Sequence, residues 1–303
     1  MKDILSQATF FDFASLQNTS QILQKRFPFL HVSSIGNTVL GRPIITYTLG
    51  EGDPATLYVG GVHALEYITS ALLVHFTAQL CACMQNRMPL HTLQPAEFFK
   101  RHSAIILPML NPDGVEIHLH GAKTAGILAQ TVEKLSGGDT RHWQANARGI
   151  DLNHNFDAGY TLLKKEEVAQ GITQPGPGKF GGYRPESETE TSALCNLCRQ
   201  IPFEKVMAFH SQGEELYWHY GPNTPPYAEK MAHSLAKSAT YTACSPSGMA
   251  AHGGFKDWFI QTTGRPGFTI EVGKGKNPLP FASWKGIYKR IEPLMALGIH
   301  ITP

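Results

Sequence analysis

The sequence predicts one α/β domain built on a mixed, largely parallel twisted sheet with helices on both faces. Short apolar segments typical of buried strands alternate with longer segments of helical periodicity, as in sheets that are covered on both sides. A length of 303 residues allows one large domain or two, and we find no repeats or low-complexity tracts. The Gly- and Pro-rich stretch at 171–185 is interpreted as a surface loop. We therefore expect a single domain over residues 1–303, with residues 1–40 packed on it as an N-terminal segment.

Six apolar segments have the length and composition of buried strands, and four longer segments have helical periodicity. The Asn-Pro-Asp-Gly sequence at 111–114 predicts a turn after one of these strands. The strands are expected at 31–35, 43–49, 57–62, 104–110, 205–210 and 267–272, and the helices at 65–84, 186–200, 225–239 and 282–297.

Three of the expected strands lead into a side chain that can do chemistry. His63 directly follows one strand, and His210 and Glu271 lie at the ends of two others. In an open α/β sheet, sites form beyond the carboxyl ends of the strands. We therefore expect these three side chains to lie at one edge of the sheet.

Charge and composition exclude several classes of protein. Lys plus Arg total 26 and Asp plus Glu total 24, so the net charge of +2 argues against a strongly basic nucleic-acid binder. The 42% of hydrophobic residues argue against a disordered chain. The start of the chain lacks the continuous apolar core of a secretory signal, and no run approaches the roughly 18 apolar residues of a membrane span. We expect a cytoplasmic protein without nucleic-acid or membrane partners, and its oligomeric state stays open.

The five cysteines do not form a recognisable zinc or redox framework. Cys195 and Cys198 make a single C-x-x-C, whereas a structural zinc site usually needs two such pairs or one pair with two histidines. A redox motif is expected at a helix start after a strand, and this pair follows a helix-like run instead. We expect reduced, buried or half-buried thiols.

His63 and Glu66 form an H-x-x-E motif at an expected strand-to-helix junction, where residues three apart point the same way. A catalytic zinc takes three protein ligands and leaves one position for water, and His210 is the natural third ligand. Because H-x-x-E alone occurs often by chance, it indicates a metal site only within a larger set of motifs.

That larger set is present and carries a family resemblance. The segments are VGGVHALEYITS, LPMLNPDGVE, NARGIDLNHNFDAGY, AFHSQGEELYW and GGFKDWFIQTTGRPGFTIEVG. In order and spacing they resemble the zinc carboxypeptidase family of the carboxypeptidase A type over residues 40–295. The resemblance implies that His63, Glu66 and His210 bind Zn²⁺, the His₂Glu ligand set known for carboxypeptidase A, and that Glu271 is the catalytic carboxylate.

This chemistry fits the residue types. Zn²⁺ polarises a scissile carbonyl and lowers the pKa of its bound water. Glu271 would take the proton of the water as general base and deliver it to the leaving amine as general acid. Asp151, in the GIDLN segment, is a candidate partner for a ligand histidine, and a capping or turn role is equally open.

Departures from the family pattern bear on specificity. Exopeptidases of the family usually carry Asn-Arg where this chain has Asn153-His154, and that Arg grips the terminal carboxylate of the substrate. Gln144 takes the place of the usual oxyanion Arg, and Arg148 is either a replacement for that charge or a surface cation. The family's mobile Tyr is missing, and His252 is a candidate donor there. We expect Gln144, Asn153, His154 and His252 to bind substrate.

WQANARGIDLN and HSQGEELYW together resemble bacterial γ-D-glutamyl-meso-diaminopimelate peptidases. This resemblance implies hydrolysis of the amide between a D-glutamyl γ-carboxyl and the diamino acid, in a small stem peptide or muropeptide of peptidoglycan. The alternatives are an ordinary metallocarboxypeptidase, a zinc amidase or deacylase, a non-catalytic peptide-binding relative, and a structural zinc protein. A structural zinc would need a fourth protein ligand, and a pure binder has no need of Glu271 beside three metal ligands.

Overall fold

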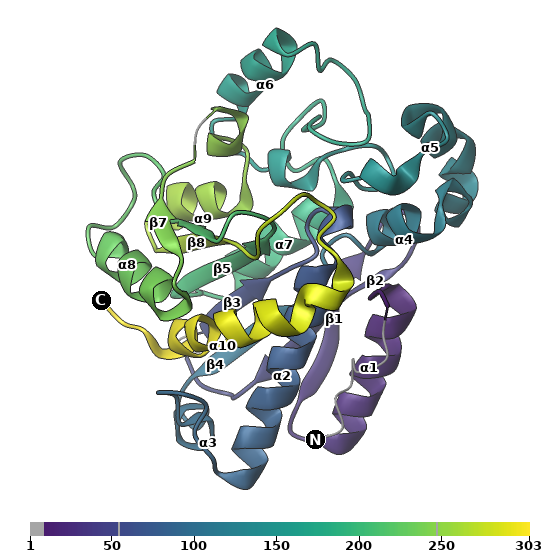
Figure 1. Cartoon of the computed structure of the whole chain (residues 1–303). Coiled ribbons are helices and arrows are strands. Elements are labelled where there is room, and N and C mark those ends of the chain that lie inside the picture. Colours follow the sequence, from purple (N-terminus) through teal and green to yellow (C-terminus); the bar gives the residue numbers. More distant parts are fainter. Residues whose placement is uncertain (1–8, 54, 247) are drawn as a thin grey trace.

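The fold is a mixed eight-stranded sheet, seen in a computed structural model that describes residues 9–53, 55–246 and 248–303 (Figure 1). The strand order is β1-β2-β4-β3-β5-β8-β6-β7. The central strands β4, β3, β5 and β8 run parallel, and antiparallel pairs flank them. The predicted α/β class with a largely parallel sheet is therefore confirmed. The strands are β1 (His31–Asn37), β2 (Pro43–Leu49), β3 (Ala55–Val59), β4 (Ser103–Leu107), β5 (Lys205–His210), β6 (Glu215–Tyr217), β7 (Thr242–Cys244) and β8 (Gly267–Glu271).

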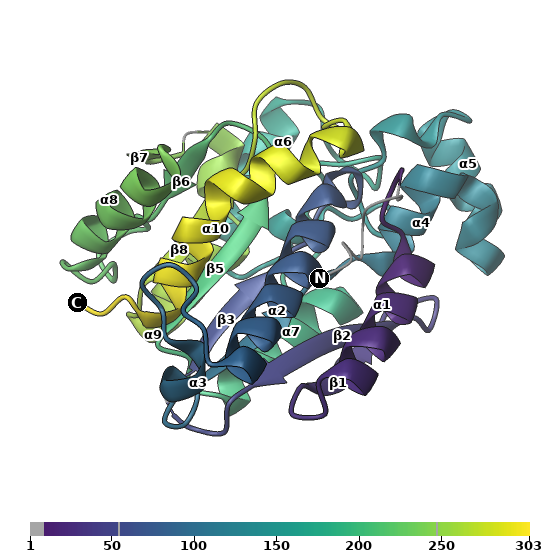
Figure 2. The same cartoon turned by 60° about the horizontal axis from the view of Figure 1, so that its bottom comes forward.

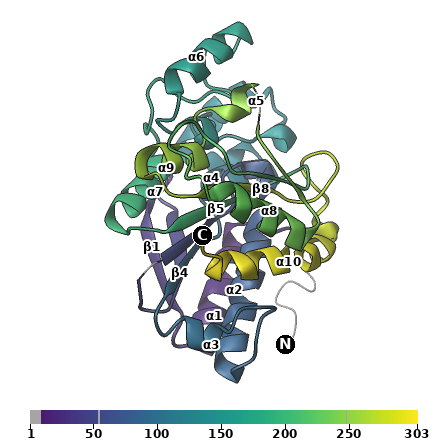
Figure 3. The same ribbon diagram turned by 90° about the vertical axis from the view of Figure 1, so that its left-hand side faces the viewer.

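Helices cover both faces of the sheet. Helices α1, α2, α8 and α10 lie on one face of the sheet, and α7 and α9 lie on the other. The two helical layers are seen on opposite sides of the sheet in Figure 3. Figure 2 shows α10, α2 and α1 side by side. Helices α4, α5 and α6 lie beyond one end of the sheet (Figure 1). The helices are α1 (Phe13–Arg26), α2 (Ile68–Asn86), α3 (Pro95–Phe98), α4 (Pro112–His120), α5 (Ala129–Ser136), α6 (Tyr160–Ala169), α7 (Thr189–Gln200), α8 (Ala228–Ala239), α9 (Phe255–Thr263) and α10 (Trp284–His300).

Successive side chains of the central strands enter two different apolar cores. In β3, Tyr58 stacks between Phe76 and Phe209 on the face of α2 and α10. Its neighbours Leu57 and Val59 enter the core under α7 and α9. Because both faces are buried, the central strands are continuously apolar rather than alternating, which is why the sequence shows them as unbroken apolar runs.

All ten predicted strands and helices are present with ends within three residues of those expected, whereas β6 and β7 were not predicted and one predicted turn is wrong. Strand β5 matches its prediction, and β3 and β4 end before the glycines and the proline that follow them. The predicted turn at 111–114 is wrong, because Pro112 begins helix α4. Asn111 caps this helix by accepting the backbone N–H of Gly114 at 2.9 Å, and a proline in the first helical turn costs no hydrogen bond.

The N-terminal part of the chain contributes to the main structure. Strand β1 pairs with β2, and the buried residues of α1 join the core on the face of α2. Residues 1–8 of the expected N-terminal segment lie outside the described residues. Cys195 and Cys198 both lie inside α7, are buried and form no disulfide.

Within the described residues, one segment is long and apolar enough to cross a membrane by length and composition. It spans Ala64–Asn86, and 72% of its most apolar window is buried inside the protein. The count of consecutive apolar residues does not reveal this segment, because Thr, Ser, His and Gln interrupt it. Helix α2 packs on the sheet as a core helix.

The close packing of α10 on the sheet predicts a glycine-dependent contact. A Cβ atom at Gly298 would lie less than 3.0 Å from the sulfur of Met207 and the hydroxyl of Tyr58, which donates to the carbonyl of Met295 at 2.7 Å. We expect Gly298→Ala to lower the free energy of unfolding by about 1–3 kcal/mol, although alanine favours helices. Urea unfolding measures the change. The matched control is Gly286→Ala in the same helix, where the added Cβ meets nothing within 4 Å. Equal effects of the two substitutions would contradict the packing argument.

Candidate active site

The sheet brings the predicted metal ligands to one edge. His63 lies four residues after β3 and precedes a short 3₁₀ turn, Ala64–Glu66, whose last residue is Glu66. His210 is the last residue of β5, the parallel neighbour of β3. The 3₁₀ turn that separates His63 from Glu66 makes both side chains face the end of β5.

The three side chains converge on one point. The Nδ1 atom of His63 lies 3.0 Å from Oε1 of Glu66, and Nδ1 of His210 lies 3.0 Å from Oε2 of Glu66. The two Nδ1 atoms are 3.2 Å apart, and the ligand atoms all fall within 4.8 Å of one another. Four-coordinate zinc with bonds of 2.0–2.1 Å separates its ligand atoms by about 3.3 Å. The donor set and its spacing therefore fit a zinc ion.

The electrostatics of this group favour a positive charge at its centre. Burial opposes protonation of His63, but the carboxylates of Glu66 and Asp151 outweigh it and raise the pKa of His63 well above its usual value. Burial acts against the charge of Glu66 too, yet His63 and His210 lower the pKa of Glu66 to about 2. A metal ion at the centre takes the place of the proton on His63, because a ligand histidine must be neutral and a ligand carboxylate ionised.

Asp151 fixes the orientation of His63 from behind. Its Oδ1 lies 3.2 Å from Nε2 of His63, the ring nitrogen that faces away from Glu66. Its Oδ2 accepts from Nε2 of Gln144 at 2.7 Å and from the backbone N–H of Lys179 at 2.9 Å. Asp151 also caps the 3₁₀ turn 152–154 through the N–H of Asn153. A carboxylate that holds the second nitrogen of a histidine sets its tautomer and raises its basicity as a ligand.

Glu271 lies beside His210 because their strands are parallel neighbours. The two residues are opposite each other in the register of β5 and β8. Burial, and then the charge of Glu66, raise the pKa of Glu271 well above its usual value. A carboxyl group beside the metal ligands is placed to take a proton from water and to return it, as a general base and acid must.

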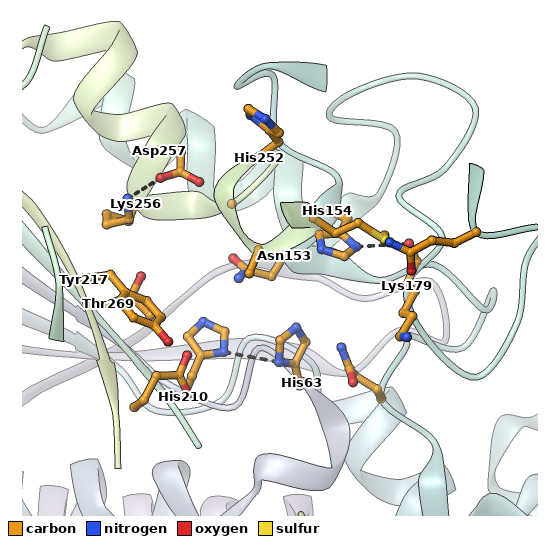
Figure 4. A pocket seen from close by; sticks show the side chains of 16 residues that line it. His63, Asn153, His154, Lys179, His210, Tyr217, His252, Lys256, Asp257 and Thr269 are labelled. Atoms are coloured by element: carbon orange, nitrogen blue, oxygen red, sulfur yellow. Dashed lines mark hydrogen bonds and ion pairs between the residues drawn. The ribbon is translucent and has the colours of Figure 1, made fainter. Parts of the chain in front are cut away.

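His63, His210 and Glu271 line a cavity of about 290 Å³. Figure 4 shows His63 and His210 facing each other on its floor, with Asn153 above them and His154 to one side. Gln144, Asn153, His154 and His252 were predicted to bind substrate, and all four lie in the wall of this cavity. His252 lies on the far side from the two floor histidines, and its buried Nδ1 has no partner among the described residues.

Arg148 is not brought to the cavity. Its backbone N–H donates to the side chain of Asn146, and its guanidinium lies 3.7 Å from Glu188 and half-exposed to solvent. We therefore do not place Arg148 in the site.

Several residues of the cavity wall were not predicted. Tyr217, on β6, extends the wall beside Glu271, and its hydroxyl donates to Glu215 at 2.7 Å. Lys256 and Asp257 form an ion pair at the opposite side of the cavity from His154 (Figure 4). Lys179, from the Gly- and Pro-rich loop, also lines the cavity. Tyr217, Lys256 and Asp257 lie inside the motifs that carry the resemblance, so the sequence marked their segments but not their side chains.

Comparisons with known proteins agree with this geometry. Residues 16–293 match the sequence profile of the zinc carboxypeptidases. The chain is 31% identical to gamma-D-glutamyl-L-diamino acid endopeptidase 1 of Lysinibacillus sphaericus, over 96% of this chain and 72% of that protein. Among solved structures, bovine thrombin-activatable fibrinolysis inhibitor superposes with a TM-score of 0.73, at 19% identity and 96% coverage of each chain. Murein-tripeptide amidase from Escherichia coli O157 superposes with a TM-score of 0.57, at 20% identity, covering 90% of this chain and 92% of that one.

The contact between Asp151 and His63 predicts a loss of metal affinity. Asp151→Asn keeps the size of the side chain but removes its charge. The amide nitrogen of asparagine would replace either Oδ1 or Oδ2, and it cannot accept the hydrogen bonds that this oxygen accepts. We expect zinc affinity to fall about 10- to 100-fold, measured by competition with a chromogenic chelator. Asp139→Asn is the matched control, because Asp139 pairs with Arg141 on the surface. Unchanged zinc affinity in a folded Asp151→Asn variant would contradict this role.

Proposed function

The chain belongs to the zinc carboxypeptidase family, and from that premise we propose that it hydrolyses the amide between a D-glutamyl γ-carboxyl and a diamino acid. Such bonds occur in the stem peptides of peptidoglycan. The observation that carries the proposal is the 31% identity to the Lysinibacillus sphaericus endopeptidase along nearly the whole chain. The cavity adds support, because it holds polar and charged groups at several points around the expected metal position.

The residues divide the chemistry among themselves. His63, Glu66 and His210 hold the zinc ion, which when bound polarises the scissile carbonyl and acidifies water. Glu271 takes a proton from the attacking water and returns it to the nitrogen of the leaving diamino acid. Asp151 keeps His63 in the tautomer whose Nδ1 faces Glu66.

The wall of the cavity positions the peptide through donors that the fold leaves available. The Oδ1 atom of Asn153 accepts the N–H of Phe255 at 3.1 Å, so its amide nitrogen can donate to a substrate carbonyl. His154 donates from Nδ1 to the carbonyl of Lys179 at 3.0 Å and keeps Nε2 for the substrate. Because His154 stands where exopeptidases carry Arg, the site lacks a bidentate grip on a terminal carboxylate at this position.

A defined peptide tests the proposed function. We expect the zinc-loaded protein to convert L-Ala-γ-D-Glu-meso-diaminopimelate into L-Ala-D-Glu and free diaminopimelate, detected by mass spectrometry and abolished by a chelator. Ordinary L-peptides are expected to keep their C-terminal residues under the same conditions. Release of C-terminal L-residues without cleavage of the γ-linked peptide would instead establish a conventional carboxypeptidase.

Substitution of the proposed proton carrier separates catalysis from metal binding. Glu271→Gln preserves size and removes the basic carboxylate, so turnover is expected to fall by about 10²- to 10⁴-fold or more while zinc content stays the same. Metal analysis and the peptide assay measure the two quantities on one sample. Glu229→Gln, on an exposed part of α8, is the control for a lost carboxylate. Full activity of Glu271→Gln would remove Glu271 from the mechanism.

A further inference from the structure

Two lysines line the active-site cavity, and their surroundings differ. Lys256 is buried with 3% exposure, pairs with the buried carboxylate of Asp257 and donates to the carbonyl of His219 at 2.9 Å. Lys179 lies at the exposed mouth of the cavity. Within residues 9–53, 55–246 and 248–303, no carboxylate lies within ion-pair distance of its amino group. The charge of Lys256 is thus neutralised locally, and that of Lys179 is not.

The backbone of Lys179 is held by the same groups that hold the metal site. Its N–H donates to Oδ2 of Asp151 at 2.9 Å, and its carbonyl accepts from Nδ1 of His154 at 3.0 Å. The φ angle of Lys179 is +70°, a left-handed conformation that costs energy for a residue with a side chain. Since Asp151 also contacts His63, the position of the Lys179 backbone is fixed relative to the metal ligands.

The side chain of Lys179 points into the cavity. Figure 4 shows it running down the wall on the side of His154, with its amino group near the level of His63. A cation therefore lies on one side of the expected metal position, at the end of a flexible four-carbon chain.

The proposed substrate supplies an anion that needs such a partner. A D-glutamyl residue linked through its γ-carboxyl keeps a free α-carboxylate, separated from the scissile carbonyl only by two methylene groups and the α-carbon. Any productive pose therefore brings this carboxylate into the cavity beside the metal site. An α-linked peptide has a carboxylate at this separation from the scissile carbonyl only when the residue is glutamate.

We propose that Lys179 binds the free α-carboxylate of the D-glutamyl residue and so selects γ-linked substrates. This inference rests on the proposed function of the same site. Lys256, which also lines the cavity, does not meet the requirement because it pairs with Asp257, and Arg148 lies outside the cavity beside Glu188. A hydrogen bond to a charged group is worth about 10-fold in binding or more.

A pair of substrates isolates this contact. One is L-Ala-γ-D-Glu-meso-diaminopimelate, and the other carries a carboxamide in place of the D-glutamyl α-carboxylate. We expect Lys179→Met to lower kcat/KM for the acid substrate about 10-fold or more and to leave the amide substrate within about twofold. Lys179→Arg is expected to keep the preference of the native protein for the acid. Methionine retains an unbranched side chain, so the left-handed backbone is no more strained than with lysine.

The remaining outcomes separate this inference from the proposed function. The control Lys165→Met removes an exposed lysine of α6 that does not line the cavity, and it is expected to change neither substrate. Equal losses on both substrates in Lys179→Met would show a structural role for Lys179. No loss on either substrate would show that another group binds the carboxylate. Either result overturns the inference, whereas hydrolysis of the acid substrate by the native protein still supports the proposed function. Failure of the native zinc-loaded protein to cleave either substrate overturns the proposed function and the inference with it.

Discussion

The carboxylate of Asp151 is the constraint on which the geometry of the site depends. It is fully buried and receives four hydrogen bonds or close polar contacts, from a ring nitrogen, a side-chain amide and two backbone N–H groups. Burial alone would raise the pKa of Asp151, but His154 and His63 outweigh it and lower that pKa below its usual range. One buried charge therefore orients a metal ligand, a wall residue and the loop that carries Lys179.

The second constraint is the parallel sheet, which made much of the site predictable. In parallel neighbours the carboxyl ends lie at the same edge, so apolar strands that lead into His63, His210 and Glu271 predict that these side chains meet. The register of β5 and β8 places His210 opposite Glu271, as that reasoning requires. The fold class and six of the eight strands in the described residues follow from local pattern, whereas the three-residue strands β6 and β7 were not predicted. The assignment of His63, Glu66 and His210 as metal ligands came from the family resemblance, because H-x-x-E alone occurs often by chance.

What the sequence did not predict depends on long-range contacts. Asp151 and Lys179 are 28 residues apart and joined by a hydrogen bond from an irregular loop, for which no periodicity exists. Arg148 contacts Asn146 through its backbone N–H and Glu188 through its guanidinium. Asn146 and Glu188 are 42 residues apart in sequence and are joined by a hydrogen bond. The turn predicted at 111–114 failed for a different reason, since Asn-Pro suits a helix start as well as a turn and only the tertiary structure decides.

The replacement of the usual Arg by His154 changes more than one contact with the substrate. A guanidinium there would offer a fixed bidentate partner to a terminal carboxylate. His154 instead donates a hydrogen bond from Nδ1 to the carbonyl of Lys179 and so supports the loop that brings this lysine to the cavity. In the proposal for Lys179, the recognised anion is the carboxylate beside the scissile bond and not the terminal carboxylate of the substrate. His154 bears on both points, because it replaces the Arg that binds a terminal carboxylate and its Nδ1 supports the loop of Lys179.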